Sequence, residues 1–147
     1  MRPKLEFVPR QVRTLKQATG LFNQEPEGLS QSLFDFLSQD FSLDEYLEVD
    51  NPAIYMIRQK GEAMQPRIHS GDVMVVNRSI KAKSGDIVVA LVHGQFCVRR
   101  FFPHDNNQGE IHVELMADQE KYRSYHLSPG IPFEVWGVVT HVLGKMK

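Results

Sequence analysis

Residues 86–102 read Asp-Ile-Val-Val-Ala-Leu-Val-His-Gly-Gln-Phe-Cys-Val-Arg-Arg-Phe-Phe, and this stretch decides the fold. Two runs rich in β-branched and aromatic residues, 86–92 and 95–102, flank the dipeptide His93-Gly94. A two-residue turn that contains glycine between two such runs is typical of a β-hairpin. We therefore expect an antiparallel hairpin here, within a domain made mostly of strands.

Further short runs of the same kind follow Asn51, and glycine or polar turn residues bound each of them. They predict strands near 54–59, 72–77, 110–115 and 133–143. The last run is nearly continuous in valine and contains Trp136. A central strand packed on both faces has this pattern, so we expect 133–143 to be one.

The first 48 residues differ, because prolines and glycines interrupt every candidate element before it lengthens. We interpret residues 1–48 as an arm and 49–147 as the β domain. Within the arm, 11–18 are long enough for two helical turns, and Ser42 with Glu45 forms a capping box for a short helix through Leu47. Four apolar arm residues need a surface to dock on, in the same chain or a neighbour. They are Leu33, Phe34, Phe36 and Phe41.

Composition excludes several classes of protein. Seventeen Lys and Arg against eighteen Asp and Glu give a net charge of −1, so we expect no direct DNA binding. The single cysteine, Cys97, excludes an intramolecular disulfide and favours a reducing compartment. No stretch approaches the roughly 20 apolar residues of a membrane span, and the N-terminus lacks the apolar block of a signal peptide. We expect a cytoplasmic protein with no contact to a membrane.

Five blocks of the chain, in order and at compatible spacing, resemble the LexA/UmuD family of serine-lysine self-cleaving peptidases. They are 60–64, 70–76, 85–90, 94–101 and 135–142. The short arm without a helix-turn-helix resembles UmuD rather than LexA. The resemblance implies a twisted β-sheet assembly like the LexA C-terminal domain, with an extended N-terminal arm. It also implies a dimer and no cofactor.

Both catalytic positions depart from the family pattern. Where the family has a serine before methionine, this chain has Ala63 before Met64, and where it has a lysine after valine, this chain has Arg99 after Val98. A methyl group cannot attack a peptide bond. A guanidinium, with a pKa above about 12, stays protonated and cannot accept a serine proton. We therefore expect neither a nucleophile nor a general base.

The cleavage site departs as well. The first 48 residues contain two Xaa-Gly bonds, Thr19-Gly20 and Glu27-Gly28, and neither has the small apolar residue that the family prefers before glycine. Counting back from Phe36 places Glu27-Gly28 at the position of UmuD's scissile bond. We interpret it as a vestigial cleavage site.

These departures predict a non-cleavable UmuD-like regulator of the SOS response to DNA damage. Its implied partners are a second copy or a cleavable relative, a Y-family translesion polymerase, and also the RecA filament and the sliding clamp. The alternative is a self-cleaving UmuD-type protease captured as an engineered inactive variant. A transcriptional repressor is disfavoured, because the arm is too interrupted for a helix-turn-helix.

Other candidate residues have plainer explanations. Cys97 shares a strand face with Arg99, but a lone strand cysteine is usually a small core residue. The six histidines are scattered without the close spacing of a zinc site, so we expect no metal. We expect Arg100 to be solvated, and Arg99 to fill the lysine position and pair with an acidic group, for which Glu27 is one option.

Overall fold

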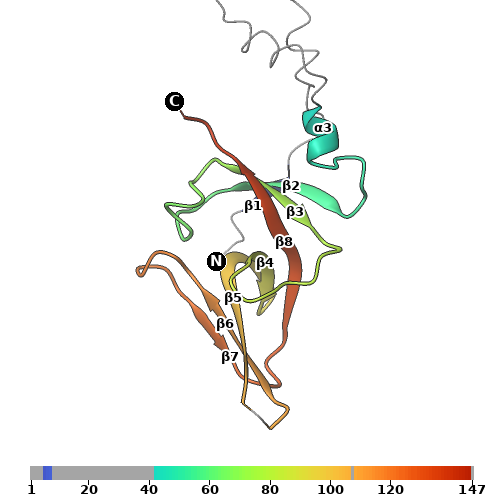
Figure 1. Ribbon diagram of the computed structural model, residues 1–147. Coiled ribbons are helices and arrows are strands. Elements are labelled where there is room, and N and C mark those ends of the chain that lie inside the picture. The colour runs from blue at the N-terminus through green and yellow to red at the C-terminus, as the bar shows by residue number, and fades with distance from the viewer. Residues whose placement is uncertain (1–4, 8–41, 107, 147) are drawn as a thin grey trace, which may run out of the picture. The chain divides into compact units, whose positions relative to one another are not determined.

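An eight-stranded antiparallel sheet dominates the computed structural model, which describes residues 5–7, 42–106 and 108–146 (Figure 1). The strands are β1 (Leu5–Phe7), β2 (Ile54–Gln59), β3 (Val73–Asn77), β4 (Ile87–Val92), β5 (Gln95–Asp105), β6 (Ile111–Met116), β7 (Tyr125–Leu127) and β8 (Phe133–Leu143). Their order in the sheet is β1-β2-β3-β8-β4-β5-β6-β7. The predicted mostly-β fold class is confirmed.

The hairpin of β4 and β5 forms as the sequence predicts. Val92 lies opposite Gln95, which leaves His93 and Gly94 as the turn. Both turn residues have positive φ, 50° and 78°. A turn with two positive φ angles matches the twist of the strands that it joins.

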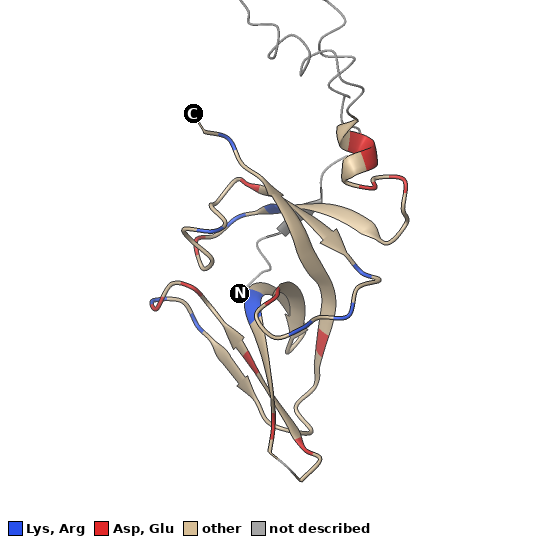
Figure 2. Ribbon diagram, in the orientation of Figure 1, with Lys and Arg blue, Asp and Glu red and all other residues tan. Residues whose placement is uncertain are grey.

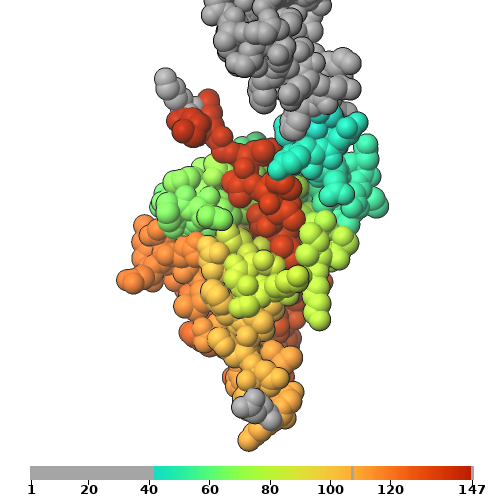
Figure 3. Space-filling model, in the orientation of Figure 1, coloured from blue at the N-terminus to red at the C-terminus, as the bar shows by residue number. Residues whose placement is uncertain are grey.

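The last strand, β8, lies between β3 and β4, so its predicted central place is confirmed. It also packs on both faces, because Trp136, Val139 and Val142 lie against one buried cluster and Val135 and Val138 against another. The packing is incomplete, since only Gly137 and Val138 of its eleven residues are fully buried. In the space-filling view part of this red segment lies open on the upper half of the visible face (Figure 3). Gly137 itself is required by a close approach, since a Cβ there would lie 2.5 Å from Cγ1 of Val76.

The curled sheet buries two separate apolar clusters, one on each face. The first contains Ile57, Met64, Ile68, Met74, Val76, Val89 and Val98. The second contains Val88, Ala90, Val92, Val113, Leu115, Leu127 and Val138. Neighbouring residues of β4 alternate between the clusters, as the two-residue period of a strand requires. Alternation on β5 likewise gives Arg99 and Arg100 different surroundings.

Two strands were not predicted, and one is longer than predicted. β1 and β7 have three residues each, too few to display an alternating pattern. β5 continues through Pro103 to Asp105, beyond the predicted end at 102. β4 pairs only as far as Arg100, so beyond that point one side of β5 has no strand partner. A proline, which lacks an N–H, is tolerated in such a strand.

The chain divides into two units, Met1–Pro9 with Ala53–Lys147, and Arg10–Pro52. In the second unit, helix α3 (Leu43–Tyr46) begins where the capping box predicts, and the Ser42 hydroxyl accepts the Glu45 N–H at 3.3 Å. The predicted helical turns at 11–18 lie outside the described residues, as do Glu27, Gly28, Leu33, Phe34, Phe36 and Phe41. Of the helices that the structure describes, none is long and apolar enough to cross a membrane.

Candidate functional site

The turn that carries position 63 follows β2 and is held by its own backbone. The Gln65 N–H donates to the carbonyl of Glu62 at 3.2 Å, and the Ile68 N–H donates to that of Met64 at 2.9 Å. Met64 is fully buried in the first apolar cluster, and Ala63 is 4% exposed. The position at which the motif predicts the family nucleophile therefore lies in a turn held by backbone hydrogen bonds, and its side chain is a methyl group.

Position 99 lies in the middle of β5, opposite Val88 on β4. Arg99 is 8% exposed, although it carries a guanidinium. Its Nε donates to the carbonyl oxygen of Arg123 at 2.9 Å, and its Nη1 donates to that of Val98 at 2.7 Å. Its Cζ lies 5.7 Å from the centre of the Tyr125 ring, within the range of a cation–π contact.

The expected acidic partner of Arg99 is not found in the described part of the chain. No carboxylate there lies within ion-pair distance of its guanidinium, and its acceptors are neutral carbonyl groups. Glu27, which the sequence offered as one option, lies outside the described residues. A buried charge is tolerated when its donors are hydrogen-bonded, as two of these are.

The loop between β6 and β7, residues 117–124, contacts both of the predicted catalytic positions, 63 and 99. The Gln119 N–H donates to the carbonyl oxygen of Ala63 at 3.0 Å, and the Arg123 carbonyl accepts from Arg99. Sequence reasoning missed this loop. Neither its composition nor its spacing indicates a link to residues so distant in the chain.

The chemistry of this arrangement follows from its two side chains. Serine-lysine peptide hydrolysis needs a hydroxyl and a neighbouring base that accepts its proton. Ala63 supplies no hydroxyl, and the guanidinium of Arg99 has no lone pair available for a proton. These two side chains therefore cannot start acyl transfer.

Cys97 lies two residues before Arg99 on β5, opposite Ala90 on β4. Burial raises the pKa of its thiol, and the nearby charge of Arg99 lowers it by less. The thiol therefore stays protonated near neutral pH, where a nucleophile would have to be a thiolate. This agrees with the interpretation of Cys97 as a small packing residue.

The expectation that Arg100 is solvated is wrong. Its Nε and Nη2 donate to the two carboxylate oxygens of Asp118 at 3.1 and 2.8 Å, and its Nη1 donates to the Gly85 carbonyl at 3.1 Å. The hydrogen bonds to Asp118 raise the pKa of Arg100. No local pattern in the sequence indicates this pair, because Asp118 lies in the loop between β6 and β7.

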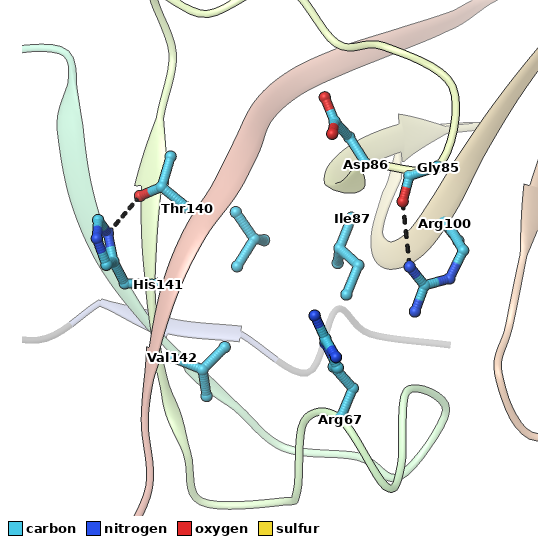
Figure 4. A pocket seen from close by; sticks show the side chains of 9 residues that line it. Arg67, Gly85, Asp86, Ile87, Arg100, Thr140, His141 and Val142 are labelled. Carbon is cyan, nitrogen blue, oxygen red and sulfur yellow. Dashed lines mark hydrogen bonds between the residues drawn. The ribbon is translucent and has the colours of Figure 1, made fainter.

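An open pocket of about 350 Å³ lies beside Arg100 (Figure 4). The residues that line it include the apolar Ile87, Val139 and Val142 and the basic Arg67 and Arg100. The carboxylate of Asp86 points away from this space, as Figure 4 shows. Positions 63 and 99 do not line the pocket, so it is separate from the candidate catalytic positions.

Three histidines come together on neighbouring strands, which the scattered sequence positions did not indicate. His104 and His126 lie 3.6 and 3.8 Å from the same oxygen of Glu114, and His112 pairs with His104 across β5 and β6. Even so, no three His, Cys, Asp or Glu side chains among the described residues are placed to share a metal ion.

Comparison with known proteins identifies the family of this chain. Residues 21–140 match the family described as Peptidase S24-like. The chain belongs to this family. It is 38% identical to protein MucA of Salmonella typhimurium over 107 residues, 71% of this chain and 69% of MucA. It is 30% identical to protein ImpA of Salmonella typhimurium over 114 residues, 77% of this chain and 74% of ImpA.

A LexA repressor, from Polaromonas naphthalenivorans, is 30% identical over 90 residues, which cover 60% of this chain and 36% of the repressor. The match thus spans most of MucA and of ImpA but a minor part of the repressor. The peptidase S24 proteins are serine-lysine autopeptidases, and this chain is a UmuD-type member of them. The resemblance inferred from the five sequence blocks is confirmed.

Proposed function

We propose that this chain is a UmuD-type regulator of the response to DNA damage that binds its partners without cutting itself. The observation that carries the proposal is the environment of Arg99. A buried guanidinium, held by two neutral carbonyls, occupies the position that the sequence motif assigns to the family's base, and Ala63 occupies the position that it assigns to the nucleophile. The S24-like peptidase fold is retained around a centre that lacks both reacting groups.

The fit of Arg99 also supports a natural rather than an engineered substitution. An arginine forced into a lysine position would leave donors without acceptors, at a cost of about 1–3 kcal/mol for each buried group. Here Nε and Nη1 each find a carbonyl, and the Tyr125 ring lies near the guanidinium. These contacts are those expected of a site adapted to arginine.

The partners that we propose are those of a chain whose N-terminal arm is not cleaved off. The first is a second copy or a cleavable relative, and the second is a Y-family translesion polymerase. The RecA filament and the sliding clamp are further candidates. Charges of both signs are interspersed along the sheet unit, which supports protein partners rather than direct DNA binding (Figure 2). The compartment that we propose is the cytoplasm.

In the same proposal, Glu27-Gly28 is a vestigial cleavage site that stays intact. The arm then stays docked through its apolar residues. These residues are Leu33, Phe34, Phe36 and Phe41. The chain therefore keeps the same binding surface for its partners. Burial of three such side chains recovers several kcal/mol, at about 25 cal/mol per Å² of apolar surface, which is enough to retain an arm.

Incubation of the purified chain with RecA filaments, and separately at alkaline pH, tests the proposal on a denaturing gel. We expect only the full-length band. An equimolar mixture with a self-cleaving member of the family is expected to form heterodimers, detected by native mass spectrometry. A shorter fragment from the unaltered chain would exclude the proposal.

The second candidate function is a self-cleaving protease that carries engineered changes at positions 63 and 99, and membership of an autopeptidase family favours it. The double substitution Ala63→Ser and Arg99→Lys separates the two. Complete RecA-stimulated cleavage of this double variant at a single arm bond would favour the engineered protease. Its persistence at full length would favour the regulator, because the arm then also lacks a cleavable bond.

A further inference from the structure

We propose that the loop between β6 and β7, residues 117–124, is a clasp that couples positions 63 and 99, and that Gln119 is the positioning residue of this clasp. The inference rests on the proposed function only in taking 63 and 99 as the family's catalytic positions. It assigns a role to a loop that contains neither of them.

One end of the clasp holds the turn at position 63 with two hydrogen bonds from a single residue. The backbone N–H of Gln119 donates to the carbonyl of Ala63 at 3.0 Å, and its side-chain Nε2 donates to the carbonyl of Gln65 at 2.6 Å. These carbonyls flank buried Met64. Gln119 therefore fixes the backbone on both sides of the turn that a family nucleophile would occupy.

The other end holds the side chain at position 99. The Arg123 carbonyl accepts from Nε of Arg99 at 2.9 Å, and the ring of Tyr125 lies 5.7 Å from the Arg99 Cζ. Sideways movement of the loop would lengthen the first contact. The guanidinium therefore follows the position of residues 123–125.

The loop is short and tied internally, so its two ends move together. The Ser124 hydroxyl accepts the Ala117 N–H at 3.0 Å and closes the neck of the loop. The Tyr122 N–H donates to the Gln119 carbonyl at 3.1 Å and forms a turn between the ends. Displacement at Gln119 is thus transmitted to Arg123 through a few hydrogen-bonded residues.

Such coupling matters because a nucleophile and its base must lie within hydrogen-bond reach, about 2.6–3.2 Å, for proton transfer. In this fold the turn at 63 and strand β5 come from distant parts of the sequence, and one loop touches both. A side chain that sets the loop therefore sets the spacing of the two positions, whatever residues occupy them.

Exchange of the Arg99 Nε proton with solvent, measured by NMR on the full chain, tests the clasp. Gln119→Glu keeps the shape of the side chain but removes the donor to Gln65, so we expect about tenfold faster exchange at Arg99. Lys121→Ala is the matched control on the same loop, because its pair with Glu62 is exposed and 3.7 Å long. We expect less than about a twofold change from it.

The reciprocal experiment replaces Arg99 with methionine, which is similar in length but has no donor. If the loop transmits displacement from Arg123 to Gln119, Arg99→Met is expected to speed exchange of the Gln119 amide as well. If Gln119→Glu does not fold, Gln119→Ala gives the same readout. Unchanged exchange at Arg99 in a folded Gln119 variant would overturn the clasp, whether or not the chain cleaves itself.

Discussion

Arg99 and Arg100 are neighbours on one strand, yet their surroundings have little in common. Arg99 is buried, and its donors reach neutral backbone carbonyls. Arg100 is partly exposed, and Asp118 neutralises it through two hydrogen bonds. Alternation along β5 puts one guanidinium at the predicted catalytic position and the other beside an open pocket. Position on the strand, rather than residue type, decides what each arginine does.

Removal of the buried guanidinium is expected to have the largest effect. Arg99→Ala deletes two hydrogen bonds from a charged group and leaves the Arg123 carbonyl without its donor. We expect a loss of about 2–3 kcal/mol in the free energy of unfolding. Urea unfolding with an unchanged slope measures this loss. A loss below about 0.5 kcal/mol would mean that the buried contacts contribute little.

Arg99→Lys sharpens the comparison, because lysine keeps the charge but lacks the planar fork. A single ammonium cannot replace Nε and Nη1 with the same geometry. We expect a loss of about 1 kcal/mol, smaller than for alanine. The same unfolding experiment measures it. Stability equal to that of the unaltered chain would indicate a site that still suits lysine.

Asp118→Asn tests the exposed arginine. Partly exposed ion pairs contribute about 0.5–1 kcal/mol and are screened by salt. We therefore expect the free energy of unfolding to fall by that amount at low ionic strength. The loss should be smaller in 1 M salt, where the Debye length is about 3 Å. The Arg99→Ala loss, measured in parallel, should persist in salt. Equal salt dependence of the two losses would remove the distinction between the arginines.

The smallest expected effect is on Cys97. Burial raises the pKa of its thiol and the charge of Arg99 opposes this, so Arg99→Ala should raise the pKa further. The thiolate fraction at a given pH falls as the pKa rises, so alkylation by iodoacetamide should become slower. The midpoint of the alkylation rate plotted against pH gives the pKa of the thiol. A midpoint that falls in the variant would contradict the assigned electrostatic effect of Arg99.

Much of the fold could be predicted because its signals are local. The hairpin of β4 and β5 depends on alternation and on a His-Gly turn, and the start of α3 depends on a capping box. β1 and β7 were not predicted, because a strand of three residues is too short to show an alternating pattern. The partial exposure of β8 was not predicted, because a run of valines does not indicate how much of each strand face other residues cover.

The candidate site could be predicted in part. Ala63 and Arg99 were identified from the motif, but their contacts were not. Gln119 lies 54 residues from Gln65 in the sequence, and Arg123 lies 24 residues from Arg99. Contacts of this kind depend on how the sheet curls, which no local pattern records. The same holds for the pair of Arg100 and Asp118.

Intact mass spectrometry of the purified chain, incubated for many hours with RecA filaments and nucleotide, tests the central claim most directly. Because neither Ala63 nor Arg99 can start acyl transfer, the account predicts a single species at the mass of all 147 residues. Two complementary fragments that sum to this mass plus one water, with a break near the front of the chain, would contradict it.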